Sequence, residues 1–181
     1  MFKKSALHLS LAAALLAAAG VANAATTPTN IAVSATVSQG CSISTTAALA
    51  FGAYDPIGAN ATAALNATGQ VSVSCSKGAT GLTISMDNGI HVVGTQRNMQ
   101  GTVATDILLY NVFQPPTNVA GVACTFPGTI PWNATAPAGV LTLTSAPSKT
   151  ARLYNVCGTV PGGQDATTGA YTDTIIATLN F

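Results

Sequence analysis

Hydrophobic and polar residues alternate along most of this chain, in short runs that are separated by residues typical of turns. The clearest run is residues 30–38. Its apolar side chains stand at every second position: Ile31, Val33, Ala35 and Val37. Because side chains of a β-strand point to opposite faces in turn, a period of two predicts strands with one buried face. Further strands are predicted at residues 70–75, 82–86, 90–94, 106–113, 139–145, 150–156 and 170–181.

Turn residues separate these runs, and Asp87-Asn88-Gly89 is the strongest of the turn signals. No apolar stripe with the period of a helix is found, and the alanine-rich residues 59–68 are expected to form a loop or at most one helical turn. Short strands with frequent turns favour an antiparallel β-sandwich or barrel. An immunoglobulin-like sandwich in a single all-β domain is the preferred fold class.

The first residues have the pattern of a secretory signal. Lys3 and Lys4 precede an apolar run at residues 7–21, and Ala22-Asn23-Ala24 fits the small-x-small cleavage rule. The alternative is a membrane anchor, but the run is shorter than the roughly 20 residues that span a bilayer. The sequence therefore predicts a signal peptide at residues 1–24, export into the periplasm, and a mature chain of residues 25–181.

Charged residues are rare in residues 25–181. Four basic side chains face five aspartates, and glutamate is missing from the chain. A basic patch for nucleic acid or anionic lipid is therefore not expected. The surface is predicted to consist of threonine, serine, asparagine, glutamine and alanine, which leaves little charge repulsion between neighbouring copies.

The cysteines point to an oxidising compartment. An even number behind a predicted signal peptide favours disulfides, and three connectivities are possible for the four residues. Metal ligation is disfavoured because it needs short spacings, whereas these cysteines are 34, 49 and 33 residues apart. The cysteines are Cys41, Cys75, Cys124 and Cys157.

Catalytic groups are not expected. His91 is the only histidine after residue 24, no nearby carboxylate accompanies it in sequence, and it is interpreted as an exposed strand residue. The chain has no G-x-S-x-G motif, and the Gly-rich residues 161–164 lack the lysine and helix of a phosphate loop. The sequence therefore predicts a protein that is not an enzyme and that has no catalytic residues, metal or cofactor.

The remaining polar residues have structural interpretations. Asp55 and Asp165 stand beside Gly or Pro and are expected to cap turns. Asp173 lies among core-type residues, so a backbone or hydroxyl partner is expected for it. Trp132, the only tryptophan, is interpreted as partly packed in the core, and binding to a carbohydrate or another surface is the alternative.

Several segments together resemble the spore coat protein U family, whose members include subunits of archaic, Csu-type chaperone–usher pili. The segments are FGAYDP (51–56), GQVSVSCSKG (69–78), RNM (97–99), LLYNVF (108–113) and CGTVPGGQDATTGAYTDTIIATLNF (157–181). They follow the family's order over nearly the whole mature chain. Cys124 and Cys157 depart from the family's pattern.

The resemblance implies an immunoglobulin-like sandwich that lacks its last strand, formed by residues 39–181. Residues 25–38 are then an N-terminal donor strand that completes a neighbouring subunit. The donor side chains would be the four alternating apolar residues of 31–37. One wall of the acceptor groove would be the end of the chain, through Ile175, Ala177, Leu179 and Phe181.

The resemblance also implies partners and disulfides. A periplasmic chaperone, an outer-membrane usher and neighbouring pilus subunits are the expected partners, in a cell-surface fimbrium that supports adhesion and biofilm formation. Cys41 is expected to pair with Cys75, as in the family, and Cys124 with Cys157 as an extra bridge. Two alternatives stay open: a coat protein of this fold that assembles without an usher, and a monomeric secreted binding module that uses loops near Trp132.

Overall fold

The computed structural model describes residues 24–181 and divides the chain into two units. One unit ends at Thr36, and the other, Val37–Phe181, contains all strands of the described residues. Residues 24–40 have neither helix nor strand. The predicted signal peptide lies outside the described residues except for its last position, Ala24.

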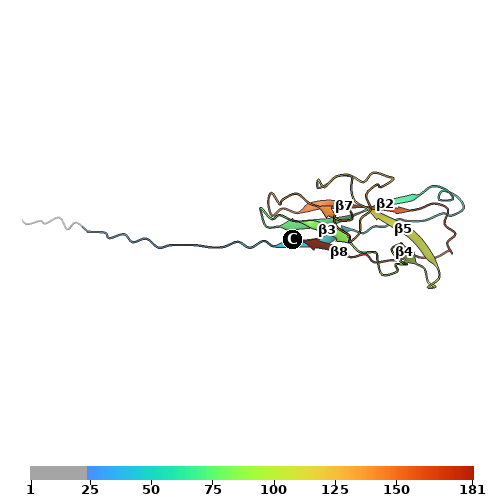
Figure 1. The fold of residues 1–181 in the computed structure, drawn as a ribbon, viewed down its shortest axis with the longest axis horizontal. Coiled ribbons are helices and arrows are strands. Elements are labelled where there is room, and N and C mark those ends of the chain that lie inside the picture. The colour runs from blue at the N-terminus through green and yellow to red at the C-terminus, as the bar shows by residue number, and fades with distance from the viewer. Residues whose placement is uncertain (1–23) are drawn as a thin grey trace, which may run out of the picture. The chain divides into compact units, whose positions relative to one another are not determined.

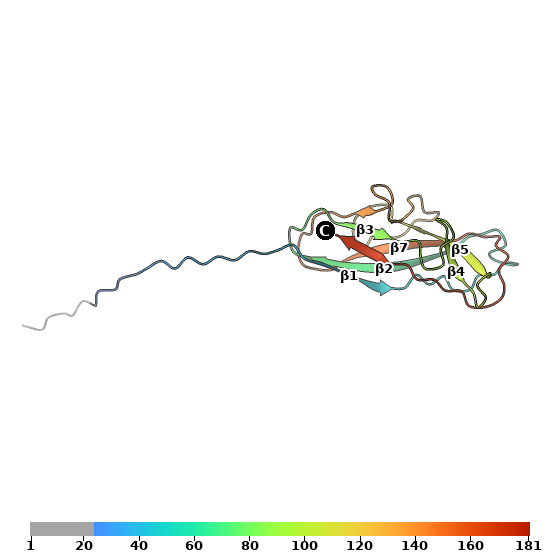
Figure 2. The same ribbon diagram turned by 60° about the horizontal axis from the view of Figure 1, so that its bottom comes forward.

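The larger unit consists of antiparallel β-strands in two sheets, which Figures 1 and 2 show from two directions. The five-stranded sheet has the order β1-β2-β7-β5-β4, and the three-stranded sheet has the order β6-β3-β8. The strands of the first sheet are β1 (Cys41–Ala47), β2 (Leu65–Cys75), β7 (Arg152–Val160), β5 (Ile107–Phe113) and β4 (Arg97–Gln100). Those of the second are β6 (Leu141–Thr142), β3 (Thr83–Met86) and β8 (Ala177–Asn180).

The centre of the five-stranded sheet is the pair β2 and β7. Their register runs from Leu65 opposite Val160 to Val73 opposite Arg152. Within β2 the valines are buried and the intervening serines are half-buried, as the alternation at residues 70–75 predicts. β2 begins at Leu65, however, so the loop expected for residues 59–68 is wrong for its second half. Pairing with β7 overrides the weak local preference of these residues.

Of the other predicted strands, residues 82–86, 106–113 and 150–156 are confirmed by β3, β5 and β7. The strand at 90–94 is wrong, because only Val93 forms a bridge there, to Gln96. The predictions at 139–145 and 170–181 are too long, since strands form only at Leu141–Thr142 and Ala177–Asn180. Strands β1 and β4 were not among the predicted segments.

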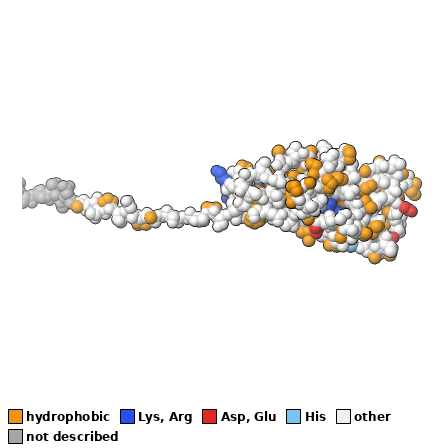
Figure 3. Space-filling view, viewed as in Figure 1, with side chains coloured by type: hydrophobic (Ala, Val, Ile, Leu, Met, Phe, Trp, Pro, Cys, Tyr) orange, Lys and Arg blue, Asp and Glu red, His pale blue; other side chains and the backbone are white. Residues whose placement is uncertain are grey.

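The two sheets enclose one hydrophobic core. Buried side chains of β2, β3, β5 and β7 belong to a single cluster, and the half-buried apolar residues of β8 pack against it. The outer surface has few charges, as Figure 3 shows for one face. The largest fully buried side chains include Trp132, Tyr154, Leu82, Ile84 and Met86.

Two disulfides lie on the side of the five-stranded sheet. Cys41 of β1 is bonded to Cys75 of β2, and Cys124 of the β5–β6 connection is bonded to Cys157 of β7. These are the two pairings that the resemblance implies. Each closes a loop of about 33–34 residues, for which the chain-entropy model gives roughly 3–4 kcal/mol of stabilisation.

None of residues 24–181 lies in a helix of the length and apolar character that a bilayer crossing requires.

Candidate functional site: an apolar groove beside a free strand edge

An apolar groove of about 380 Å³ opens between the end of β1 and the segment that leads into β8. Its floor includes Val71 of β2, Val156 of β7 and Met86 of β3. Its rims are residues 47–49 on one side and residues 172–175 with Ala177 on the other. Other lining residues are Phe51, Met99, Tyr110 and Tyr171. The groove therefore reaches the core between the two sheets.

Two glycines in the sheet leave room for Leu49 and Phe51, which fill one end of the groove. A Cβ atom at Gly158 of β7 would lie 2.7 Å from side-chain carbons of both Leu49 and Phe51. One at Gly69 of β2 would lie 3.2 Å from the Cβ of Leu49. The chain thus leaves the edge of the sheet after Ala47 and packs its apolar side chains over two positions without side chains. Beyond the pair Ala47 and Gln70, β1 no longer pairs with β2.

Both strands that flank the groove are edge strands. Within residues 24–181, β8 pairs only with β3, and β1 pairs only with β2. An edge strand presents backbone N–H and C=O groups to any extended segment that lies beside it. The groove thus combines a bare apolar floor with an edge that can accept another strand.

The structure shows where the residues of the expected groove wall lie. Ile175 and Ala177 line the groove, and both pack against the core together with Leu179. Phe181 is 58 % exposed. The alternation of the predicted strands does not distinguish the floor residues or the pair Leu49 and Phe51 from other apolar positions. The alternation of Ala47, Leu49 and Phe51 is the signal that could have revealed the pair.

The expected donor residues are solvent-exposed. Ile31, Val33 and Val37 are 82 %, 91 % and 87 % exposed, and Ala35 is exposed as well. Isolated exposed apolar residues are ordinary, whereas these form a regular row in a segment without secondary structure. Whether the donor and wall residues meet between two molecules stays a prediction.

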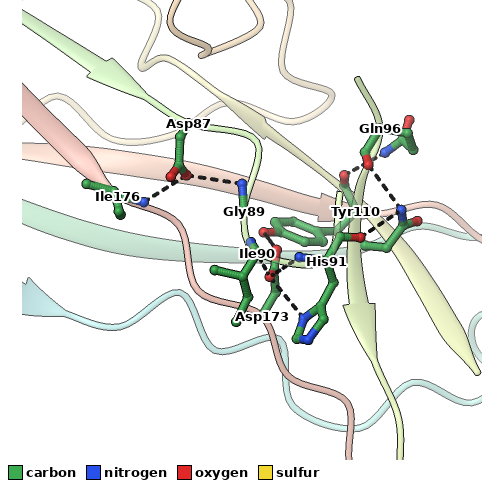
Figure 4. Close-up of polar contacts among 9 residues, drawn as sticks. Asp87, Gly89, Ile90, His91, Gln96, Tyr110, Asp173 and Ile176 are labelled. Atoms are coloured by element: carbon green, nitrogen blue, oxygen red, sulfur yellow. Dashed lines mark hydrogen bonds and ion pairs between the residues drawn. The ribbon is translucent and has the colours of Figure 1, made fainter. Parts of the chain in front are cut away.

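Asp173 holds the segment before β8 in place at the rim of the groove (Figure 4). Its side chain is only 3 % exposed. It accepts hydrogen bonds from the backbone N–H groups of Ile90 and His91 at 3.0 and 3.2 Å. The Tyr110 hydroxyl donates a further bond to it at 2.6 Å. The expectation of backbone and hydroxyl partners for Asp173 is confirmed.

Burial is the main cause that raises the pKa of the Tyr110 phenol, and the hydrogen bond to Asp173 adds to it, so this hydroxyl stays protonated and continues to donate.

Asp87 also anchors the segment before β8, from the other end of the loop 87–91. Its carboxylate accepts from the N–H groups of Gly89 and Ile176, at 3.1 and 2.8 Å. The loop 87–91 is therefore tied to the rim segment 173–176 at several points.

Arg97 of β4 lies beneath this loop and is 6 % exposed. Its guanidinium donates to the carbonyl oxygens of Met86, Asp87 and Trp132. Burial lowers the pKa of Arg97, but three carbonyl partners compensate the buried charge. Residues 90–94 form a loop instead of a strand because side chains satisfy backbone groups that a ladder would otherwise use: Asp173 accepts from the N–H groups of Ile90 and His91, and Asn98 donates to the His91 carbonyl.

The interpretation of His91 as an exposed strand residue is wrong. Its side chain is 27 % exposed in a loop, and its Nδ1 lies 3.2 Å from Asp173 Oδ1. The carboxylate that His91 meets could not be identified from its sequence neighbours, because Asp173 comes from the last segment of the chain. In residues 24–181, no three His, Cys, Asp or Glu side chains come together as metal ligands.

Two further expectations concern single side chains. Trp132 is fully buried, and its Nε1 donates to the Ile84 carbonyl at 2.9 Å, so a surface-binding role for this residue is wrong. Asp55 caps a turn as expected: its Oδ1 accepts from the N–H groups of Gly58 and Ile57, and these bonds lower the pKa of its carboxyl. The turn cap expected at Asp165 stays a prediction.

Comparison with known proteins relates the chain to one family. The family model for the Spore Coat Protein U domain matches residues 27–178. Protein U of Myxococcus xanthus is 32 % identical over an alignment of 189 positions that covers 98 % of each chain.

A solved structure has a similar fold. A chain in the crystal structure of the CsuC–CsuE chaperone–tip adhesion subunit pre-assembly complex, from archaic chaperone–usher Csu pili of Acinetobacter baumannii, matches with a TM-score of 0.53 at 19 % identity. The match covers 81 % of the present chain and 41 % of the solved one, so this chain spans less than half of that chain's length. The fold is thus the all-β fold of chaperone–usher pilus subunits. The family model over residues 27–178 and the identity to Protein U show that the chain belongs to the Spore Coat Protein U domain family.

Proposed function

We propose that this chain is a structural subunit of a surface fibre of the pilus type. In the fibre, the groove of one subunit receives residues 31–37 of the next. The observation that carries this proposal is the groove itself, which couples an apolar floor to the free edge of β8. An incoming extended segment would add backbone hydrogen bonds at the edge and insert alternate side chains into the floor.

The donor segment matches the groove in chemistry. Residues 25–38 carry no charged side chain, and the only charged residue that lines the groove, Asp173, already has its partners. Full burial of an Ile or Val contributes roughly 1.5–3 kcal/mol. Four anchors would together contribute on the order of 5–9 kcal/mol, with about 1 kcal/mol net for each backbone hydrogen bond. Such a joint would dissociate slowly.

The family and the sequence support the remaining parts of the proposal. Residues 1–24 direct export, residues 25–38 form the donor strand, and residues 39–181 form the acceptor domain. The solved relative was crystallised as a chaperone–subunit complex, which supports a periplasmic chaperone that covers the groove before assembly. An outer-membrane usher, a cell-surface location, and roles in adhesion and biofilm formation complete the proposal.

The test replaces donor side chains on one face only. Ile31→Asn with Val33→Asn should abolish fibres, because two polar amides would enter the apolar floor. Ala32→Asn with Ser34→Asn is the matched control on the opposite face and should leave fibres intact. Fibres are counted by electron microscopy of cells, and chaperone-bound subunit is measured in periplasmic extracts. Unchanged fibres in the Ile31/Val33 variant would refute the donor role.

A second candidate is a coat protein of the same fold that assembles without an usher, and the family's description as a spore coat domain favours it. Strand exchange between copies is common to both candidates. Deletion of the usher separates them: surface fibres vanish if this chain is an usher-assembled pilus subunit, and surface protein persists if it is a coat protein.

A further inference from the structure

Residues 38–40 are held against the turn that follows β2. The Gln39 side chain forms two bonds with the backbone of Thr80, donating to its carbonyl at 3.1 Å and accepting from its N–H at 3.4 Å. Ser76 Oγ accepts from the Gly40 N–H at 3.1 Å and lies 3.3 Å from the Ser38 carbonyl, to which it can donate. The Ser76 N–H donates to the Gly40 carbonyl at 2.8 Å.

These contacts extend the pairing of β1 and β2 beyond the strand ends. Cys41 opposite Cys75 is the first register pair, and the disulfide joins the same two residues. Gly40 is not among the glycines with positive φ, so the chain passes through this residue without a tight hairpin turn. Residues 38–40 thus continue the course of β1 instead of reversing it.

A reversal at this point would have a specific consequence. A two-residue turn at Gln39–Gly40 would pair Ser38 with Cys41 and, counting back, Val33 with Thr46 and Ile31 with Ala48. Ala48 lines the groove. The chain's own donor segment is therefore long enough to reach its own groove along the free edge of β1.

Such a self-inserted arm would compete strongly with assembly. A segment tethered by a short linker has an effective concentration in the millimolar range, above that of free subunits. Without an obstacle, each subunit would close its own groove and would neither donate nor accept a strand. A fibre subunit of this design needs a feature that disfavours the reversal.

We propose that residues 38–40, bound to Ser76 and Thr80, act as a clamp that keeps the arm out of its own groove and reserves the groove for a second copy of the chain. This inference rests on the proposed function, because it assumes that residues 31–37 are a donor strand. Gln39 and Ser76 are the positioning residues, since their side chains supply four of the bonds that a reversal would break.

The experiment removes the clamp in two steps. Gln39→Ala with Ser76→Ala deletes the side-chain bonds. Gln39→Asn with Ser76→Ala removes the Ser76 bonds, shortens the side chain that reaches Thr80 by one methylene, and creates an Asn-Gly dipeptide, the preferred sequence of a two-residue hairpin turn. Thr159→Ala is the matched control, because it removes a hydrogen bond to Asn66 between the neighbouring strands β7 and β2, away from the clamp.

The full-length chain is unfolded, refolded at micromolar concentration, and separated into monomer and polymer by size-exclusion chromatography with light scattering. Monomer that cannot bind a labelled peptide of residues 25–38 counts as self-inserted. Its fraction should rise roughly three- to tenfold in the Ala variant, as expected for the loss of a few exposed hydrogen bonds, and further in the Asn variant. The control should match the unsubstituted chain.

Adding Ile31→Asn and Val33→Asn to the Asn variant should restore peptide binding, because the arm then no longer fits its own groove. An unchanged monomer fraction in both clamp variants of a chain that still polymerises would overturn the clamp alone. If the unsubstituted chain neither polymerises nor binds the peptide, the proposed function falls together with the inference.

Discussion

The two sheets of this protein differ in how far each is completed by its own chain. In the five-stranded sheet, β2 has a strand on either side and a nine-pair register with β7. In the three-stranded sheet, β8 has four residues and one neighbour. Both disulfides involve strands of the first sheet, and none involves the second.

The difference also appears in the side chains. Val71, Val73 and Val156 of the five-stranded sheet are buried, whereas Ile175, Ala177 and Leu179 are only half-buried although they face the same core. A core that is closed on one side and open on the other is incompletely stabilised by its own residues. The comparison teaches that the five-stranded sheet is closed by its own chain, whereas the edge of β8 is left unpaired within residues 24–181.

The largest effect is expected from the disulfide between Cys124 and Cys157. Replacing both residues by serine should lower the free energy of unfolding by roughly 3–4 kcal/mol, because the unfolded chain gains loop entropy. Urea denaturation measures the loss. Affinity for a peptide of residues 25–38 should stay unchanged, since neither cysteine lines the groove. A loss of peptide affinity equal to the loss of stability would contradict the division between the two sheets.

The next largest effect is expected for the loss of a core side chain. Val73→Ala removes one in the closed part of the core, and Ile175→Ala removes one in the groove. Val73 is fully buried, and its truncation should cost about 2–3 kcal/mol with or without bound donor peptide. Ile175→Ala should cost less than this in the free subunit and more once the peptide fills the groove, because only then is the side chain fully enclosed. Thermal unfolding with and without peptide measures both costs. An equal cost of Ile175→Ala in the two states would show that the peptide does not cover Ile175 and would contradict binding in the groove.

The smallest effect distinguishes two tyrosines. The Tyr110 hydroxyl donates to Asp173 beside the groove, whereas the buried Tyr154 hydroxyl in β7 has no hydrogen-bond partner among residues 24–181. Tyr110→Phe should cost about 1.5–3 kcal/mol because a hydrogen bond to a carboxylate is lost. Tyr154→Phe should be close to neutral. Urea denaturation at pH 7 measures both, and a larger cost at Tyr154 would reverse the assignment.

The same pair predicts a response to alkaline pH. Burial raises the pKa of both phenols above the usual value near 10, so the unfolded chain releases these protons first. The stability that they contribute is complete below about pH 10 and is lost as the pH rises above that value. Stability measured from pH 8 to pH 11 should fall less steeply in Tyr110→Phe than in the unsubstituted chain. An identical slope in both would contradict the pKa shift.

Alternation predicted those strands whose two faces have different surroundings. The run at residues 70–75 became part of β2, and the run at 106–113 became β5, because one face of each lies on the core. The same rule failed at residues 90–94 and over much of 170–176. There, Asp173 accepts from the N–H groups of Ile90 and His91, and Asp87 accepts from that of Ile176, and each carboxylate comes from a part of the sequence distant from the group it binds.

The candidate site was only partly predictable for the same reason. The end of the chain was identified as one wall of the groove from the resemblance, and Ile175 and Ala177 do line it. The other residues that line the groove could be identified only from the fold, because Val71, Met86, Tyr110 and Val156 come from four different strands. The filling of one end by Leu49 and Phe51 depends on Gly69 and Gly158, which become neighbours only when β2 pairs with β7.

By itself, the sequence determined an all-β class, a low charge, and the family, because these follow from local periodicity, composition and short motifs. Only the tertiary structure decided which edge stays free, where the groove opens, and that His91 meets Asp173. The physical reason is that strand pairing joins residues far apart in the chain, and alternation states which face of a strand is apolar without stating what covers it.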